Sequence, residues 1–112
     1  MPEWKVYAYE LNANAGASGK VDAVTIPSAR NFTLRKVTFV FPTGSNFLLQ
    51  VRIMWGDDFV IPDKGYIVGD GNVIPVSTDI KYQGGQAIIV WYNNTDTANS
   101  HKCLIIFEGV LE

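Results

Sequence analysis

The sequence contains only one cysteine and one histidine in 112 residues. A lone cysteine cannot form a disulfide within the chain, and these two residues cannot supply the four ligands of a structural zinc site. Oxygen ligands that calcium could use occur at Asp57, Asp58, Asp63, Asp70 and Asn72. Their spacing does not match an EF-hand loop, and Asp and Asn commonly form turns. The sequence therefore predicts neither a metal site nor a cofactor.

Charge is also scarce, because Asp, Glu, Lys and Arg make up 18% of the chain against about 25% in an average protein. The net charge is −2 and the nine basic residues do not cluster, which argues against binding to nucleic acid. No apolar run approaches the ~18 residues of a membrane-spanning helix. The start of the chain lacks the basic and apolar regions of a secretion signal. We expect synthesis in the cytoplasm, with no nucleic-acid or membrane partner.

No segment shows helical periodicity, whereas apolar and polar residues alternate with period two along the whole chain. The residues predicted to face inward are Tyr7, Tyr9, Leu11, Val37, Phe39, Phe41, Leu49, Val51, Ile53 and Trp55. Strands are expected at 6–11, 21–26, 34–41, 49–55, 59–61, 66–68, 73–76, 80–82, 86–92 and 102–111. This pattern predicts one all-β domain over residues 1–112, a two-sheet antiparallel sandwich of about eight strands. Jelly-roll topology is favoured, with a seven-stranded immunoglobulin-like sandwich as the alternative.

The last third of the chain contains two apolar runs, 87–92 and 103–107, separated by the polar stretch 93–100. This order predicts a buried β-hairpin with a polar projection. Both runs are apolar on both faces, whereas a two-layer sandwich normally leaves one face of each sheet in water. The second face therefore needs a cover. A second copy of the chain would provide it in a homo-oligomer, and the loop 12–19 is the monomeric alternative.

A partner or ligand surface is predicted beside the polar stretch 93–100. Trp91 and Tyr92 are adjacent, so their side chains point to opposite faces and one large ring needs a partner or is exposed. The residues assigned to this surface are Trp91, Tyr92, Asn93, Asn94 and Asp96. An exposed aromatic ring can also stack on a sugar. A carbohydrate-binding sandwich, with a glycan as partner, is thus the alternative function.

No catalytic residue is assigned, and an enzyme is not expected. His101 is predicted to face solvent at a strand start, and Cys103 to be a small buried apolar residue. The two lie on the same side of an extended strand, which leaves a reactive thiol as the alternative. Asp57 and Asp58 are adjacent and would point to opposite faces, so they cannot form a close carboxylate pair. No Gly-x-Ser-x-Gly elbow is present.

Five segments carry a family resemblance, namely 37–44, 51–53, 60–62, 69–71 and 90–95. In order they read VTFVFPTG, VRI, VIP, GDG and VWYNNT, and this order resembles small β-sandwich proteins in the virions of tailed phages and thermophile viruses. The resemblance implies a structural role as a capsid decoration, cement or vertex protein. It also implies a virion location and self-association, a trimer being one form. The major capsid protein is the second implied partner.

Overall fold

The computed structural model describes residues 2–112, which form eight β-strands. The strands are β1 (Glu3–Ala13), β2 (Ser18–Thr25), β3 (Phe32–Phe41), β4 (Leu49–Trp55), β5 (Asp58–Ile61), β6 (Asn72–Tyr82), β7 (Ala87–Asn94) and β8 (His101–Leu111). None of the described residues belongs to a helix long and apolar enough to cross a membrane.

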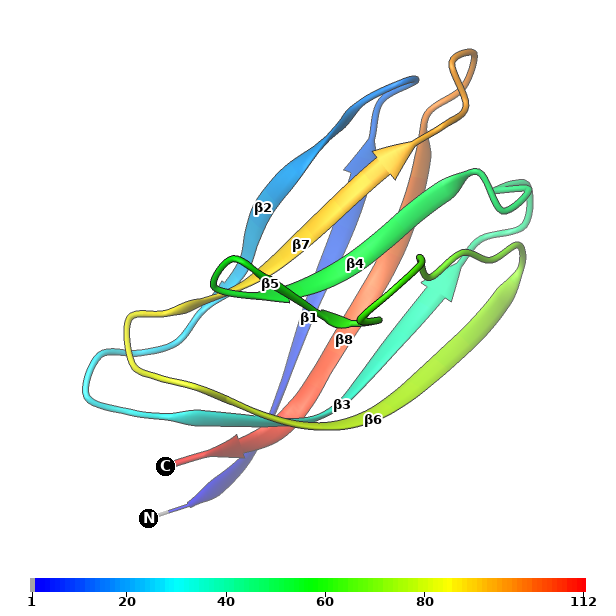
Figure 1. Ribbon diagram of the computed structural model, residues 1–112. Coiled ribbons are helices and arrows are strands. Elements are labelled where there is room, and N and C mark those ends of the chain that lie inside the picture. Colours follow the sequence, from blue (N-terminus) through cyan, green and yellow to red (C-terminus); the bar gives the residue numbers. More distant parts are fainter. Residues whose placement is uncertain (1) are drawn as a thin grey trace.

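The strands form two antiparallel sheets of four, packed face to face (Figure 1). Sheet A has the order β1-β8-β3-β6, and sheet B has the order β2-β7-β4-β5. The pairs β1 with β8, β2 with β7, β3 with β6 and β4 with β5 are those of one long hairpin rolled into a sandwich. This arrangement is a jelly roll. It confirms the predicted fold class and topology.

The predicted hairpin between the last two strands is wrong. β7 lies in sheet B between β2 and β4, and β8 lies in sheet A between β1 and β3. Each of the two is an interior strand of its own sheet. The connection at 95–100 crosses between the sheets, which lie about 10 Å apart in a sandwich. Sequence alone cannot distinguish such a crossing from a hairpin, because both need two apolar strands and a short polar loop.

Alternation along the strands builds the core between the sheets. Val37, Phe39 and Phe41 of β3 are almost completely buried, as are Leu49, Val51 and Ile53 of β4. Tyr7 and Tyr9 of β1 pack against this core, and Leu11 belongs to it. These inward positions confirm the predicted alternation.

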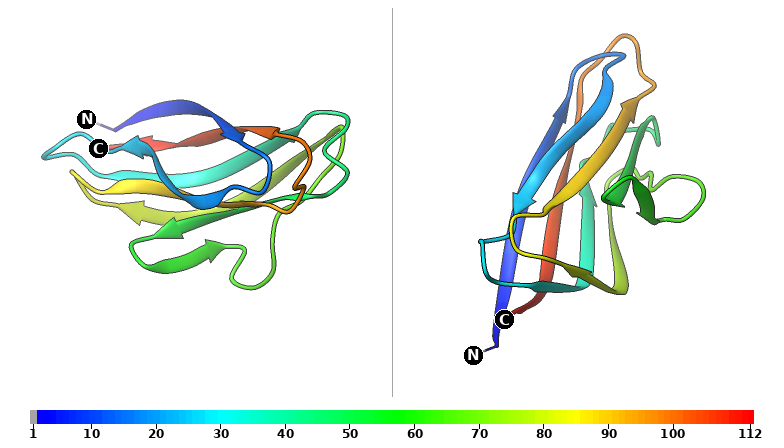
Figure 2. Two further views of the ribbon diagram at one scale, coloured as in Figure 1. Left: turned by 90° about the horizontal axis from the view of Figure 1, so that it is seen from above. Right: turned by 60° about the vertical axis from the view of Figure 1, so that its left-hand side comes forward.

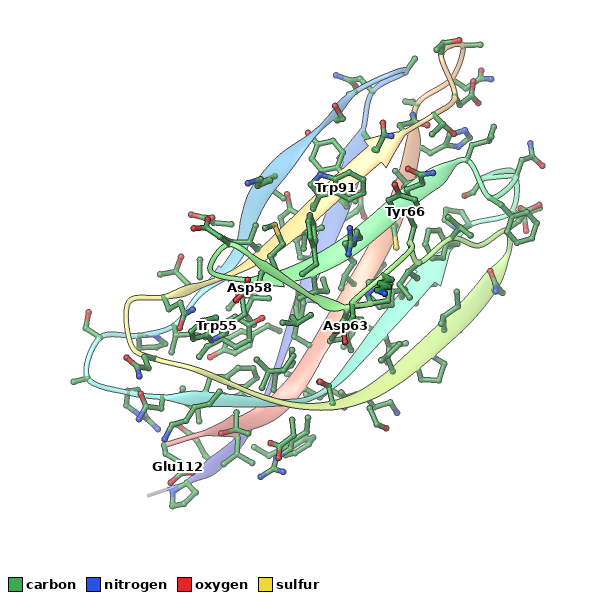
Figure 3. The ribbon with its side chains drawn as sticks, in the orientation of Figure 1. Trp55, Asp58, Asp63, Tyr66, Trp91 and Glu112 are labelled. Carbon is green, nitrogen blue, oxygen red and sulfur yellow. The ribbon has the colours of Figure 1, made fainter. Side chains whose placement is uncertain are left out.

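Trp55 departs from the predicted pattern. Met54 lies on the outer face of sheet B with Gln50 and Arg52 and is buried there, whereas Trp55, at the end of β4, is 39% exposed. The indole Nε1 of Trp55 donates a hydrogen bond to the carbonyl of Lys81 in β6, at 2.9 Å. Trp55 therefore links sheet B to sheet A at the edge of the sandwich instead of filling the core (Figure 3).

Three predicted boundaries also change. The strands expected at 73–76 and 80–82 form the single strand β6, an edge strand that tolerates Pro75. The segment 66–68 forms no strand, only an isolated bridge between Ile67 and Val51. The loop expected at 12–19 is shorter, because β1 continues to Ala13 and β2 begins at Ser18.

Candidate interaction surfaces

The five residues assigned to a partner surface do not lie on one face of the molecule. Trp91 and Asn93 lie on the outer face of sheet B, in register with Arg52 and Gln50 of β4. Tyr92 packs against the core on the other side of β7. Asn94 is buried, and Asp96 belongs to the loop that crosses between the sheets.

The outer face of sheet B is covered in part by the chain itself, over β4 and β7, whereas Lys20 and Asp22 of β2 are exposed. The segment 56–68, which we call the strap, contains β5 at the edge of sheet B and the loop that follows it, and this loop projects from the outer side of the sheet (Figure 2). Tyr66 stacks on Trp91 with ring centroids 5.5 Å apart and an angle of 19° between the rings. Phe59 meets Trp91 edge to face at 6.0 Å. Trp91 is therefore half-buried beneath aromatic rings of the strap, with Tyr66 stacked on it (Figure 3).

Arg52 holds the strap in place. Its guanidinium carbon lies 3.5 Å from the centroid of the Phe59 ring, a close cation–π contact. One guanidinium nitrogen also donates to the carbonyls of Pro62 at 3.2 Å and Asp63 at 2.9 Å. For Trp91, the expectation that a second copy or the loop 12–19 provides the cover is thus wrong. The sequence of the strap does not alternate with period two, so the sequence alone does not show that it packs on Trp91.

Asn94 connects three segments at one end of the sandwich. Its buried amide nitrogen donates to the carbonyls of Ala13 at 3.2 Å, Asn14 at 3.1 Å and Asn99 at 3.0 Å. These carbonyls belong to the last residue of β1, to the loop that follows β1 and to the crossing loop at 95–100. Buried carbonyls need donors, so a short amide at this position satisfies several at once. Asn94 is a structural residue of this end of the molecule.

Asp96 organises the crossing loop. Its Oδ1 accepts hydrogen bonds from the backbone N–H of Ala98 at 2.9 Å and of Asn99 at 3.2 Å. Its Oδ2 lies 2.8 Å from Nε2 of His101. The hydrogen bond from the Ala98 amide has the largest effect on the pKa of Asp96, and the contact with His101 has the next largest. Together these interactions favour the ionised carboxylate and lower the pKa of Asp96 to about 2.

His101 begins β8 as expected, but it does not face solvent. Its side chain is only 11% exposed, and its ring packs against the loop through the contact with the Asp96 carboxylate. On one side of this pair lies an open polar hollow of about 330 Å³, between the turn at 42–46 and the loop at 96–102. Within residues 2–112, no group of three or more His, Cys, Asp or Glu side chains is placed to hold a metal ion.

Cys103 lies in the core with no exposed surface, as the sequence predicted. Burial raises the pKa of its thiol to about 12, because a thiolate would lose its hydration there. The thiol donates to the carbonyl of Leu104 at 3.7 Å, whereas the His101 ring is paired with Asp96. The alternative of a thiol nucleophile therefore has no support in the geometry.

Unlike sheet B, sheet A has an uncovered apolar outer face. The most exposed apolar side chains on it are Trp4 at 58%, Val6 at 54%, Val73 at 59% and Leu104 at 37%. In the two views of Figure 2, none of the described segments crosses the outer side of this sheet. Sequence reasoning recognised the two-faced apolar character of the run 103–107 but did not place it beside Val6 and Val73. Only the strand order reveals that they share one face.

No protein-family model matches the chain, and no curated protein matches it either. Two similar solved structures come from phage capsids. One is the acid-stable capsid structure of Helicobacter pylori bacteriophage KHP30, with a TM-score of 0.58, 13% identity, and coverage of 97% of this chain and 93% of the other. The second is the capsid asymmetric unit of cyanophage Pam1, with a TM-score of 0.58, 10% identity, and coverage of 96% and 85%. The protein therefore has the fold of chains found in phage capsids, as the sequence resemblance implied.

Proposed function

We propose that this protein is a structural component of a virus particle, a capsid decoration, cement or vertex protein that acts without catalysis. It self-associates and contacts the major capsid protein. The observation that carries this proposal is the uncovered apolar outer face of sheet A, on a fold similar to chains of two phage capsids. Contiguous apolar surface of this kind is typical of sites where proteins meet.

The chemistry of the chain supports a role without catalysis. Asp96 and His101 bind each other and order a loop, and the one thiol is buried in its neutral form. A nucleophile needs an accessible, activated group. In residues 2–112, the groups closest to that description serve the packing of the molecule.

The proposal is tested by purifying virus particles from a culture that produces this chain. Mass spectrometry of particles banded on a density gradient should find the chain at a fixed ratio to the major capsid protein. A control fraction from the same gradient, free of particles, should lack it. Particles without the chain, together with chain that stays in the soluble fraction, would contradict the proposal.

Carbohydrate binding is the second candidate, and one observation favours it. Tyr66 is 48% exposed and lies over Trp91, so its outer ring face could stack on a sugar. Trp91 itself is covered and is a weaker candidate than the sequence suggested. Retardation of the protein in polysaccharide gels, lost in Tyr66→Ala and kept in Trp55→Ala, would support this function. Equal migration with and without polysaccharide would exclude it for the glycans used.

A further inference from the structure

The outer face of sheet A carries its side chains in rows that cross the strands. The strand register places Glu10, Leu104, Val40 and Val73 in one row, and Ala8, Ile106, Thr38 and Pro75 in the next. A third row contains Val6, Glu108, Lys36 and Ser77. The centre of the face is therefore apolar, and one acidic and one basic residue lie side by side on its two middle strands.

From this arrangement we infer that the outer face of sheet A binds the same face of a second copy of the chain, with a two-fold axis parallel to the strands between β8 and β3. The inference rests on the self-association in the proposed function and names the surface and geometry. Rotation about this axis leaves each residue at the same height along the strand direction. It places the β8 position of one copy at the β3 position of the other. Each β8 then lies over the β3 of the other copy.

One acidic and one basic residue of the face are complementary in this geometry, whereas Glu10, on the flank, lies opposite Val73 of the other copy. Glu108 is opposite Lys36 of the other copy, and the symmetry repeats the contact. Within residues 2–112, neither side chain has an ion-pair partner within 4.0 Å in its own chain. Packed sheets lie about 10 Å apart, a gap that these two long side chains can span together. A symmetric interface requires such self-complementarity.

The apolar residues match in the same way. Leu104 lies opposite Val40 of the other copy, and Ile106 lies opposite Thr38, because these are register partners on the two middle strands. On the flanks, Ala8 of β1 lies opposite Pro75 of β6. The apolar centre is thus buried on both copies, with the charged row at its border.

The face reaches the lower size limit of a specific interface. With strands about 4.8 Å apart and about 3.3 Å per residue, four strands about eight residues long cover roughly 500 Å². Two copies would bury about 1,000 Å² in total, which is the size at which specific interfaces begin.

Charge reversal tests the inference. Lys36→Glu places two like-charged contacts in each dimer, and so does Glu108→Lys. Each variant alone should weaken the dimer at least about a hundredfold in Kd, because like charges facing each other in an interface are strongly unfavourable. Sedimentation equilibrium measures Kd directly. Lys20→Glu reverses the same charge on β2, on the opposite sheet, and should leave Kd unchanged.

Mixing the two variants separates the interface from folding. Lys36 and Glu108 are also neighbours within one chain, so each single variant carries an internal repulsion that mixing cannot remove. An equimolar mixture restores both opposite-charge contacts and should form a heterodimer of near wild-type Kd. The double variant Lys36→Glu/Glu108→Lys should dimerise as well.

Each outcome decides between the inference and the proposed function. If the wild type self-associates but both single variants do so equally well, the inferred surface is wrong while self-association stands. The same conclusion follows if the variants dissociate and mixing does not restore the dimer. The face would then be left for another occupant such as the major capsid protein. A wild type that stays monomeric to millimolar concentration overturns both.

Discussion

At the scale of single residues, Asp96 shows how a short polar loop becomes rigid. Its two carboxylate oxygens are shared between backbone amides of the loop and the ring of His101. The sequence marked this residue as part of a partner surface, whereas its contacts are internal. Nothing in the sequence around Asp96 distinguishes a loop-forming carboxylate from a ligand-binding one, because both occur in polar stretches between strands.

The lowered pKa of Asp96 predicts a specific pH dependence of stability. The ordinary pKa is 3.8 and the folded-state pKa is about 2, so the ionised form stabilises the fold. This contribution is complete above the ordinary pKa and is lost as the pH falls toward about 2. Asp96→Asn should therefore be less stable than wild type at pH 7, with a difference that shrinks between about pH 4 and pH 2.

Urea unfolding at a series of pH values measures this difference. Asp79→Asn is the control, since Asp79 is 72% exposed and pairs with Arg35 on the surface. A gap between wild type and Asp96→Asn that stays constant from pH 7 to about pH 2 would show that ionisation of Asp96 does not stabilise the fold.

Cys103 gives a second prediction at this scale. Its complete burial and a pKa of about 12 mean that the native protein presents neither an accessible nor an ionised thiol. Labelling by a chromogenic disulfide reagent at pH 8 should be slow in buffer and fast in denaturant. The chain has no other cysteine, so the signal is unambiguous. Native labelling as fast as that of a free thiol would disprove the burial.

At the scale of elements, the crossing between β7 and β8 depends on Asn94. Asn94→Ala leaves carbonyls of the β1 end and of both flanking loops without their donor. We expect a loss of about 2 kcal/mol in the free energy of unfolding. Asn93→Ala is the matched control, because Asn93 makes one partly exposed side-chain hydrogen bond to Gln50, worth under about 1 kcal/mol.

Chemical denaturation of both variants measures these losses. Equal stability of Asn94→Ala and Asn93→Ala would mean that Asn94 does not connect the three segments. The comparison isolates the three hydrogen bonds of Asn94, since both asparagines lie at the end of the same strand.

The strap is the second element whose position depends on one side chain, that of Arg52. Arg52→Ala removes the donor to two strap carbonyls and the partner of Phe59. Hydrogen exchange of the amides in 63–68 should become faster, while amides in β3 keep their protection. Arg52→Lys should restore little, because a single ammonium group cannot reproduce the planar contact with Phe59. Unchanged exchange in 63–68 would show that other contacts hold the strap.

Most of the strands were predictable from the sequence, but their partners were not. Alternation identified the inward residues of β1, β3 and β4 because burial on one face leaves a period of two. It could not assign β7 and β8 to different sheets, since the apolar pattern of a strand does not show which strands lie beside it. The cover of Trp91 was missed for a related reason. Phe59 and Tyr66 lie far from Trp91 in the chain and meet it only after the jelly roll closes.

At the scale of the whole molecule, the two sheets are treated differently by the rest of the chain. Sheet B has its own cover in the strap, whereas sheet A presents Trp4, Val6, Val73 and Leu104 to solvent. The sequence argument that an apolar strand needs a second cover therefore applies to β8 and not to β7. Contact with another molecule would supply that cover.

Sedimentation equilibrium of the wild-type protein, from micromolar to millimolar concentration, tests this account most directly. The monomer has a mass of 12.4 kDa. We predict a species of twice that mass that becomes dominant with rising concentration, as two sheet A faces bury their apolar centres against each other. A mass of 12.4 kDa throughout the range would contradict the central claim that the outer face of sheet A is an interface between copies.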